Sequence, residues 1–575
     1  MAHGGSVRIV ATMSLIPKDL TPVYKATVAK GTDARRWQRA EYVSFLPPCN
    51  EGCPAGENVQ RWLSFAQAGR YREAFELYVE ENPLPATHGR ACYHPCEDAC
   101  NRGKLDSPIA IHSVDRFLGD LAIEQGWTFR AGPPTGKRVL VVGAGPGGLS
   151  CAYHLRRLGH DVEIRDALPE PGGMLRYGIP AYRLPREIVD AEIARIVAMG
   201  VTITCDHRVA DIVAEKEEGG FDAVFLALGA HVGNHLAVST TDASKILDAI
   251  EMLESVERGE KPMLGRVVAV VGSGNTAMDA ARIAKRLGAE EAVLVVRTPE
   301  GKVRAHRAEA EEAFAEGVKV QWLSTVDQFH GDTIKVEKLV LGPDGKTYVG
   351  SGTFETVQAD SLVLAVGQHA DVGFLRSIEG MRFSSGDTLA VDDQMGTGAA
   401  GIFAGGDLIG GARTMTAAVG HGKRAARCID AYLRGTTFAR PPKRPVVHYE
   451  QLNLPVYLDA DRREEPRLPL EQRTGFEEVV KGLTEPEVRY EAERCLSCGN
   501  CYECDNCYAA CPEQAIVKLG KGRGYKVDLD LCTGCAVCYE QCPCHAIEMT
   551  PEPTLEAPHG LVGEPTVPRR FKVRP

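Results

Sequence analysis

The stretch RVLVVGAGPGG at residues 138–148 sets the fold expected of this chain. Its first five residues form a run typical of a strand that is buried on both faces of a sheet. Gly143, Gly145 and Gly148 follow in G-x-G-x-x-G spacing, which permits a tight turn, lets the backbone approach a pyrophosphate and packs a helix closely on the strand. Asp166 comes about 20 residues later, where a carboxylate binds a ribose hydroxyl. The pattern predicts a dinucleotide site.

A second turn of the same kind lies in RVVAVVGSGNTA at residues 266–277. Gly272, Gly274 and Ala277 give G-x-G-x-x-A spacing between an apolar run and a helical pattern. The next apolar run, AVLVVRT, ends in Arg297 instead of an acidic residue. An arginine there can face a 2′-phosphate or stack on adenine, and a plain surface arginine is the alternative. Two such turns in one chain predict two bound nucleotides.

Three further apolar runs end in glycine, and we interpret each as a buried strand: AVFLALG (223–229), SLVLAVG (361–367) and GIFAGGD (401–407). Asp407 stands at the end of the last run, where the ribityl and phosphate groups of a flavin would form hydrogen bonds. Together with the two Gly-rich turns, these runs predict an α/β fold of two interleaved Rossmann-like domains.

Length and charge narrow the class of protein further. The chain has 575 residues, and roughly 100–200 residues per domain predicts three to five domains. Its 66 Lys and Arg residues against 77 Asp and Glu residues give a net charge of −11, which argues against nucleic acid as the main partner. No stretch approaches about 18 consecutive apolar residues, and the N-terminal residues lack a signal-peptide pattern. We therefore expect a cytoplasmic protein with no membrane span.

Nineteen cysteines point to metal or redox sites, because clustered cysteines in a long chain without a secretion signal seldom form a disulfide scaffold. Two repeats of C-x2-C-x2-C-x3-C-P lie near the C-terminus. In this pattern three nearby thiolates hold one [4Fe–4S] cluster and the fourth crosses to the other, whereas a zinc module is the alternative. We predict an α+β bacterial-ferredoxin domain in which cluster 3 is held by Cys501, Cys504, Cys507 and Cys542, and cluster 4 by Cys511, Cys532, Cys535 and Cys538.

The middle of the chain resembles the two-dinucleotide flavoproteins, specifically the glutamate synthase small-subunit family. The matching sequence segments are GAGPGGLSCAYHLRRLGHDV, PEPGGMLRYGIPAYRLP, GSGNTAMD, AVGQ and AGGD. The resemblance implies FAD on the first turn and a nicotinamide cofactor on the second, with hydride transfer to flavin that needs no catalytic acid or base. The implied FAD residues are Gly143, Gly145, Gly148, Asp166, Gly173, Met174, Leu175, Gly406, Asp407, Thr416 and Ala417, and the implied NAD(P) residues are Gly272, Gly274, Asn275, Thr276, Ala277, Arg297 and Gly367.

One departure from the family pattern bears on the choice of nicotinamide cofactor. Members that use NADPH usually carry paired arginines after the second strand, whereas this chain has Arg297 followed by Thr298. Because a phosphate clamp loses strength with each missing cation, we expect NAD(H) rather than NADP(H).

The resemblance also implies an N-terminal helical domain that holds two further cubanes. The family usually begins with R-C-x2-C followed by C-x3-C-P. Here C-x3-C-P is present as Cys49 and Cys53, but R-C-x2-C occurs only at residues 494–498. We expect the C-terminal segment to fold back and complete the N-terminal site, while a structural or free cysteine pair is the alternative. Cluster 1 then uses Cys49, Cys100, Cys495 and Cys498, and cluster 2 uses Cys53, Cys92, Cys96 and Asp115, with His112 as the rival for the fourth place.

These patterns divide the chain into successive regions. We expect an N-terminal arm (1–40), a helical Fe–S domain (41–130), a first FAD-binding segment (137–230), an NAD(P)-binding domain (231–370), a second FAD-binding segment (371–445), a linker (446–494), a ferredoxin-like domain (495–550) and a tail (551–575).

The layout resembles the NAD(P)H-acceptor subunit of 2-oxoacid:acceptor oxidoreductases such as phenylglyoxylate dehydrogenase. That resemblance implies a subunit that reduces NAD+ through FAD with electrons from thiamine-diphosphate partner subunits. A glutamate-synthase-type small subunit that delivers NADPH electrons outward, a stand-alone NAD(P)H:ferredoxin oxidoreductase and a zinc-binding scaffold are the alternatives.

Overall fold

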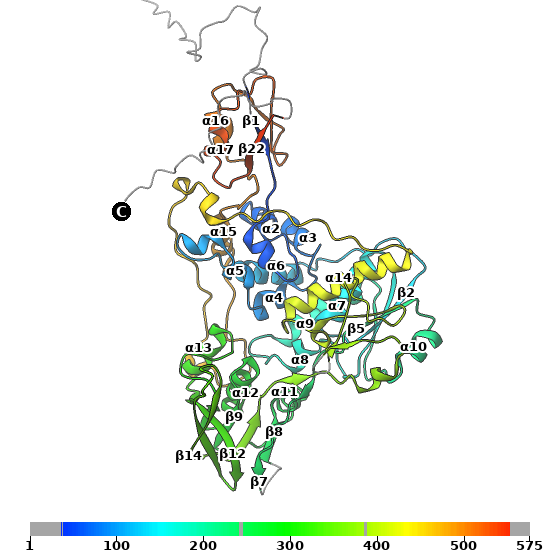
Figure 1. Ribbon diagram of the computed structural model, residues 1–575, viewed down its shortest axis with the longest axis vertical. Helices are drawn as coiled ribbons and strands as arrows, with labels where there is room; N and C mark the ends of the chain where they lie inside the picture. Colours follow the sequence, from blue (N-terminus) through cyan, green and yellow to red (C-terminus); the bar gives the residue numbers. More distant parts are fainter. Residues whose placement is uncertain (1–35, 37, 241–244, 385–387, 553–575) are drawn as a thin grey trace, which may run out of the picture. The chain divides into compact units, whose positions relative to one another are not determined.

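A computed structural model of the chain describes residue 36 and residues 38–240, 245–384 and 388–552. The expected N-terminal arm and tail lie almost entirely outside the described residues. The chain forms two compact units (Figure 1). One comprises the described residues of Ser44–Tyr502, and the other comprises the described residues up to Val43 together with those from Glu503 to Glu552. Within the described ranges, no helix has both the length and the apolar character that a membrane crossing requires.

A five-stranded parallel sheet forms the first dinucleotide-binding half of the larger unit, with strand order β19-β5-β2-β3-β4. The predicted strands at 138–142 and 401–407 appear as β2 and β19, and the long separation of β19 from β5 in sequence confirms the interleaving. The strands span Arg138–Val142 (β2), Asp161–Arg165 (β3), Thr202–Thr204 (β4), Ala223–Leu226 (β5) and Ile402–Ala404 (β19). Helices α7 (Pro146–Arg157), α9 (Arg186–Val197), α10 (Ile212–Glu218) and α14 (Met415–Leu433) accompany this sheet.

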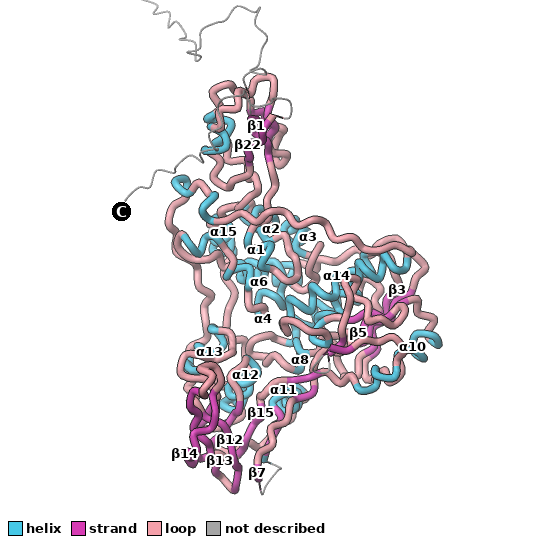
Figure 2. Tube along the Cα trace, viewed as in Figure 1, coloured by secondary structure: helices cyan, strands magenta, loops and turns pink. Residues whose placement is uncertain are grey.

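A second parallel sheet, of order β11-β10-β9-β15-β8, forms the other half. A pair of short antiparallel strands, β6 (Val232–Gly233) and β16 (Gln368–His369), marks where the chain enters and leaves it. The sheet strands span Ile246–Asp248 (β8), Val267–Val271 (β9), Glu291–Val295 (β10), Lys319–Gln321 (β11) and Ser361–Leu364 (β15), and the helices Ala249–Glu257 (α11), Asn275–Arg286 (α12) and Arg307–Ala315 (α13). Figure 2 shows the adjoining four-stranded sheet built from β7 (Ser239–Thr240), β12 (Ser324–His330), β13 (Thr333–Leu341) and β14 (Tyr348–Gln358).

Short helices make up the N-terminal region of the larger unit, as the sequence predicted. Trp62 and Phe75 are fully buried in its core. Helix α15 (Glu485–Glu493), from the expected linker, adds the buried side chains of Val488 and Ala492 to the same core. The N-terminal helices span Pro48–Gly52 (α1), Val59–Gln67 (α2), Tyr71–Tyr78 (α3), Pro85–Ala91 (α4), Pro95–Asp98 (α5) and Ile111–Glu124 (α6).

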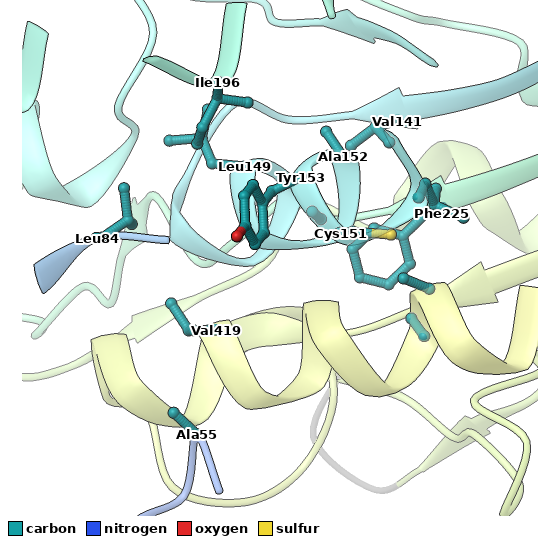
Figure 3. Packing of buried hydrophobic residues seen from close by; sticks show 14 of the residues in the cluster. Ala55, Leu84, Val141, Leu149, Cys151, Ala152, Tyr153, Ile196, Phe225 and Val419 are labelled. Carbon is teal, nitrogen blue, oxygen red and sulfur yellow. The ribbon is translucent and has the colours of Figure 1, made fainter. Parts of the chain in front are cut away.

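Helices α7 and α14 pack side by side beneath the first sheet (Figure 3). Val419 of α14 and Cys151 and Tyr153 of α7 are buried between them, together with Phe225 of β5. Ala55 lies against α14, so this helix contacts both the sheet and the cysteine-bearing segment that follows Cys53.

The smaller unit is held by an antiparallel pair of strands from the two ends of the chain, β1 (Gln38–Tyr42) and β22 (Ile547–Pro551). A second pair is β20 (Ile516–Lys518) with β21 (Tyr525–Val527), and the helices are α16 (Asn506–Ala510) and α17 (Val537–Glu540). The residues that form this unit differ from the domain boundaries expected at 40 and 495. Strand β1 belongs to the unit because it pairs with β22, and the C-terminal part of the unit begins at Glu503.

Candidate functional site

A cavity in the larger unit has a volume of ≈ 550 Å³ and is lined by residues of both Gly-rich turns. That volume lies in the range of cofactor pockets. From the predicted residues, its lining includes Gly143, Gly145, Asp166, Gly173, Met174, Leu175, Gly406, Asp407, Asn275, Thr276 and Gly367. The structure therefore brings most of the expected FAD and NAD(P) residues to one space.

The two turns are built in the same way. Gly143 and Gly272 have φ angles of +108° and +149°, and a Cβ on either would lie within 2.4 Å of a carbonyl oxygen of the facing strand end. Only glycine fits such positions. Gly145 and Gly274 immediately precede α7 and α12, so both helix N-termini begin at the turns, where free N–H groups suit phosphates.

Asp166, the residue predicted to contact a ribose, also binds backbone N–H groups of its own surroundings. One carboxylate oxygen accepts a 2.6 Å hydrogen bond from the Ala144 N–H and the other accepts one of 2.8 Å from the Leu168 N–H. The side chain is 8% exposed and faces the cavity. Asp166 thus holds the first turn in shape from the end of β3.

Several predicted residues lie outside the cavity wall. Gly148 packs behind the first turn, where a Cβ would lie 1.9 Å from the Gly143 carbonyl oxygen. Gly272, Gly274, Ala277 and Arg297 are absent from the lining. Thr416 and Ala417 also lie outside it, whereas their neighbours Thr414, Met415 and Ala418 line the cavity, because the helical turn directs successive side chains to different faces.

Sequence reasoning missed a polar group at the junction of the two halves. Arg183 donates a 2.7 Å hydrogen bond to the carboxylate of Asp279 on α12, and both line the cavity. Tyr93 also lines it and accepts a 2.6 Å hydrogen bond from Asn275. Arg183 lies within the matching segment PEPGGMLRYGIPAYRLP and Asp279 ends the matching segment GSGNTAMD, which were the available signals for them, whereas Tyr93 carried no distinguishing pattern.

The four cysteines predicted for cluster 1 surround one small cavity in the helical region of the larger unit: Cys49, Cys100, Cys495 and Cys498. Burial raises the pKa of the Cys49 thiol, and the other three thiols add to the shift. Backbone and side-chain donors point at the sulfurs, with Ser497 N–H at 3.4 Å from Cys495 and Asn101 Nδ2 at 3.5 Å from Cys498. Four grouped thiols, of which Cys498 is buried and the others half-buried, with N–H donors to two of the sulfurs, suit an iron–sulfur cluster.

The cluster 2 cysteines are also grouped, since the pKa of Cys96 is raised by burial and then by the nearby charges of Asp115, Glu97, Cys53 and Cys92. Asp115 is 6% exposed, and among the described residues its Oδ1 has no hydrogen-bond partner. An unpaired buried carboxylate oxygen is costly unless it binds something. The residues present therefore fit a cluster with three thiolates and one carboxylate.

His112 is less available than Asp115 for the fourth place. Its Nδ1 lies 2.7 Å from Glu97 and its Nε2 lies 3.1 Å from Glu465. Glu97 also accepts a 2.7 Å hydrogen bond from Arg462. His94, Glu97 and His112 come close enough to suggest a separate metal site, but the contacts with Glu97, Glu465 and Arg462 already occupy both ring nitrogens of His112 and both carboxylate oxygens of Glu97.

A buried carboxyl near cluster 2 went unnoticed in the sequence. Glu57 follows Cys53 by four residues and is 5% exposed. Burial raises its pKa to about 7, although it accepts a 2.7 Å hydrogen bond from Asn82. Its charge also acts on Cys53 and Asp115.

In the smaller unit, a cavity is lined by the four cysteines predicted for cluster 4: Cys511, Cys532, Cys535 and Cys538. Backbone N–H groups of Ala515 and Gly534 point at Cys511 and Cys532 from 3.3 and 3.4 Å.

Three of the cluster 3 cysteines are grouped in the same unit. The pKa of Cys507 is raised by burial and then by the nearby charges of Cys542 and Cys504. The Ala546 N–H lies 3.2 Å from the Cys542 sulfur. The fourth predicted ligand, Cys501, precedes this unit in the chain.

Positive φ angles recur between paired cysteines. Ser497, Asp505 and Ala536 have φ values of 52°, 68° and 63°. Non-glycine residues seldom adopt this conformation, and where they do the backbone N–H groups turn toward one point. In the loop from Cys495 to Cys498, the Ser497 N–H accordingly points at the Cys495 sulfur.

Three families match this chain. The pyridine nucleotide-disulphide oxidoreductase family matches residues 137–422. The family described as dihydropyrimidine dehydrogenase domain II, 4Fe-4S cluster, matches residues 25–127. The 4Fe-4S dicluster domain matches residues 500–546.

Curated relatives cover most of the chain. The NADP(+)-dependent formate dehydrogenase subunit beta of Moorella thermoacetica is 36% identical over 78% of this chain and 70% of its own length. The NADPH-Fe(3+) oxidoreductase subunit beta of Geobacter sulfurreducens is 32% identical over 79% of this chain and 75% of its own length. The glutamate synthase [NADPH] small chain of Mycobacterium tuberculosis is 30% identical over 70% of this chain and 88% of its own length.

Proposed function

Because the chain belongs to the glutamate-synthase-like FAD- and NAD(P)-dependent oxidoreductases with iron–sulfur domains, we propose that it reduces NAD+ with electrons that a partner dehydrogenase delivers to its clusters. It is an FAD-dependent electron-transfer subunit of an NAD(P)H-linked oxidoreductase complex. When bound, FAD supplies the exchange between a two-electron hydride and single electrons.

One observation carries this proposal. Ala91 and Tyr93 line the large cavity, and Cys92, a proposed ligand of cluster 2, stands between them in the chain. The cysteine loop therefore belongs to the wall of the dinucleotide cavity. A cluster on Cys53, Cys92, Cys96 and Asp115 would lie next to the flavin, which supports electron exchange between the two groups.

Each region of the cavity has a proposed task in holding the cofactors. The first turn, with Asp166 behind it, binds the FAD phosphates and ribose, and Gly173–Leu175 run along the ring system. Asn275 and Thr276 at the start of α12 bind the nicotinamide dinucleotide. Tyr93 and Gln368 orient these two side chains by hydrogen bonds to Asn275 and Thr276.

We propose NAD(H) as the nicotinamide cofactor. Arg297 is exposed at the end of β10, but the hydroxyl of the following Thr298 is buried and has no partner among the described residues. At residues 297–298 the chain therefore carries one arginine where the paired-arginine clamp for a 2′-phosphate carries two. Arg304, whose N–H donates a 2.8 Å hydrogen bond to Ser273 in the second turn, is a further exposed arginine near that position.

The proposed partner is a thiamine-diphosphate 2-oxoacid oxidoreductase core of the phenylglyoxylate type in the cytoplasm. A formate-oxidising core is the second candidate, because the relative that is 36% identical to this chain is named a formate dehydrogenase subunit. In either complex the partner oxidises the substrate, and the clusters of this chain receive the electrons.

The test begins with anaerobically purified full-length chain. We expect about sixteen iron atoms and one FAD per chain, from four clusters of four iron atoms each. Reduced viologen dye should then drive NAD+ reduction. A colourless protein, or a loaded protein that leaves NAD+ untouched, would contradict the proposal.

The partner is tested separately by affinity purification from the native source. Thiamine-diphosphate 2-oxoacid oxidoreductase subunits among the co-purifying proteins are the expected result. Formate-oxidising subunits in their place would replace the proposed partner but leave the electron-transfer role of this chain intact.

A further inference from the structure

A hydroxyl group on the flavin-facing helix contacts one of the cluster 2 cysteines. Thr416 Oγ1 lies 2.9 Å from Cys92 Sγ, and Thr416 is 3% exposed. The two residues are far apart in the chain and lie on separate elements, α14 and the loop after α4. The contact therefore depends on how the larger unit packs.

The first turn of α14 divides its side chains between two neighbours. Thr414 caps the helix by accepting a 3.2 Å hydrogen bond from Ala417 N–H. Thr414, Met415 and Ala418 line the dinucleotide cavity, whereas Thr416 points away from it to Cys92. One helical turn thus touches both the flavin space and the cysteine loop.

Further contacts fix α14 against the cluster 2 segment. A Cβ on Gly420 would lie 2.2 Å from the Pro54 carbonyl oxygen, so the helix approaches the residue after Cys53 as closely as a glycine permits. Lys423 Nζ donates hydrogen bonds to the Ala55 carbonyl and to Glu81, the latter at 2.6 Å. These contacts fix α14, and with it Thr416, against the segment that follows Cys53.

The direction of the Thr416 hydrogen bond follows from the chemistry of the cysteine. A cysteine that binds iron is a thiolate and carries no proton. Its sulfur accepts, so the threonine hydroxyl must donate. The His94 N–H already donates to the same sulfur at 3.3 Å, which gives Cys92 two donors.

We propose that Thr416 is a positioning residue that donates a hydrogen bond to the Cys92 thiolate and thereby raises the reduction potential of cluster 2, the cluster next to the flavin. The inference rests on the proposed function. Reduction adds one electron to the cluster and breaks no bond, and the added negative charge falls partly on the sulfurs. A hydroxyl dipole aimed at a sulfur stabilises the reduced form more than the oxidised form.

The test is a set of substitutions at Thr416 in the full-length, cluster-loaded chain. Thr416→Val keeps the shape but removes the donor, and Thr416→Ala removes it without adding bulk. In both, the potential of one cluster should fall, measured by redox titration with electron paramagnetic resonance. We expect a roughly tenfold smaller ratio of reduced to oxidised cluster at a fixed applied potential, which is about 59 mV for one electron.

Thr416→Ser should restore the wild-type potential, because it restores the donor. The matched control is Ser150→Ala, which removes a buried hydroxyl whose 2.8 Å hydrogen bond goes to the Val419 carbonyl on α14 and not to a proposed cluster ligand. This control should leave the cluster potentials unchanged.

The outcomes separate this inference from the proposed function. Equal potentials in the valine, alanine and serine variants, with iron and flavin retained, would overturn the role of Thr416 alone. If the valine variant fails to assemble, the comparison of alanine with serine decides the question. A wild-type chain without iron or flavin would overturn the proposed function itself.

Discussion

The side-chain amide of Asn275 donates a 2.6 Å hydrogen bond to the phenol oxygen of Tyr93. Asn275 is the first residue of α12, at the second Gly-rich turn, whereas Tyr93 directly follows Cys92. The Tyr93 ring also stacks on His306, with ring centroids 5.2 Å apart. One tyrosine thus joins the cysteine loop to the proposed nicotinamide site.

Replacing Tyr93 by phenylalanine should weaken nicotinamide binding. The change removes the acceptor and leaves the Asn275 amide without its partner, which costs about 1 kcal/mol. We expect the KM for the preferred nicotinamide cofactor to rise about fivefold, measured by steady-state reduction with viologen dye. Tyr432→Phe, at an exposed tyrosine of α14, is the control. An unchanged KM in Tyr93→Phe would show that the contact does not position Asn275.

Replacing Cys495 by serine tests the fold-back of the C-terminal segment. If Cys495 helps to hold cluster 1, the variant should lose about four iron atoms per chain, because one cubane contains four. Iron analysis of the anaerobically purified protein measures the loss. Cys205→Ser is the matched control, since Cys205 is a half-buried cysteine outside the proposed ligand sets. Wild-type iron content in the Cys495 variant would refute the assignment.

Replacing Asp115 by alanine tests the fourth ligand of cluster 2. We expect the electron paramagnetic resonance spectrum of one reduced cluster to change, because the buried carboxylate oxygen would no longer bind iron. His112→Gln should leave that spectrum unchanged, since both ring nitrogens of His112 are occupied by Glu97 and Glu465. If the spectrum of Asp115→Ala is unchanged, Asp115 is not the ligand. The same measurement on Glu57→Gln and His112→Gln then shows which of these two side chains binds the cluster.

Replacing Thr298 by arginine tests the choice of nicotinamide cofactor. The second cation should strengthen binding of a 2′-phosphate, so the ratio of kcat/KM for NADP(H) to that for NAD(H) should rise about tenfold, or about 1.4 kcal/mol. Thr353→Arg adds the same charge at an exposed position on β14 and should leave the ratio unchanged. A Thr298→Arg enzyme with the wild-type ratio would mean that another residue sets the preference.

The ion pairs of His112 predict a pH dependence of stability. Burial alone would lower the pKa of His112, but Glu97 and Glu465 outweigh it and raise the pKa to about 10. An unfolded histidine titrates near pH 6.5. The stabilisation is therefore complete below about pH 6.5 and is lost as the pH rises through about 10.

His112→Gln should accordingly lower the free energy of unfolding by about 3 kcal/mol at pH 6, since it breaks a buried ion pair. The loss should be small above pH 10. Urea unfolding followed by tryptophan fluorescence at the two pH values measures it. A loss of the same size at both would contradict the raised pKa.

The local chemistry of both dinucleotide turns and of the cysteine repeats could be read from the amino-acid sequence alone. The strand, turn and helix predicted around Gly143 and Gly272 are present as β2 with α7 and β9 with α12. The sequence predicts these features because the residues that determine each of them lie close together in the chain. A buried strand requires an apolar run, and the turn requires glycine where a Cβ would clash with the neighbouring strand. The interleaving of the two sheets was predicted from the order of such runs.

Apart from the return of Cys495 and Cys498 to Cys49, the meeting of distant segments became clear only in the folded chain. The absent N-terminal R-C-x2-C motif suggested that Cys495 and Cys498 return to Cys49, but their placement in one cavity depends on α15, which buries Val488 and Ala492 in the core that holds Trp62. The contact of Thr416 with Cys92 and the pairing of β1 with β22 had no signal in the sequence. A local pattern sets backbone conformation and ligand spacing, whereas contacts between segments hundreds of residues apart follow from how buried apolar faces pack together.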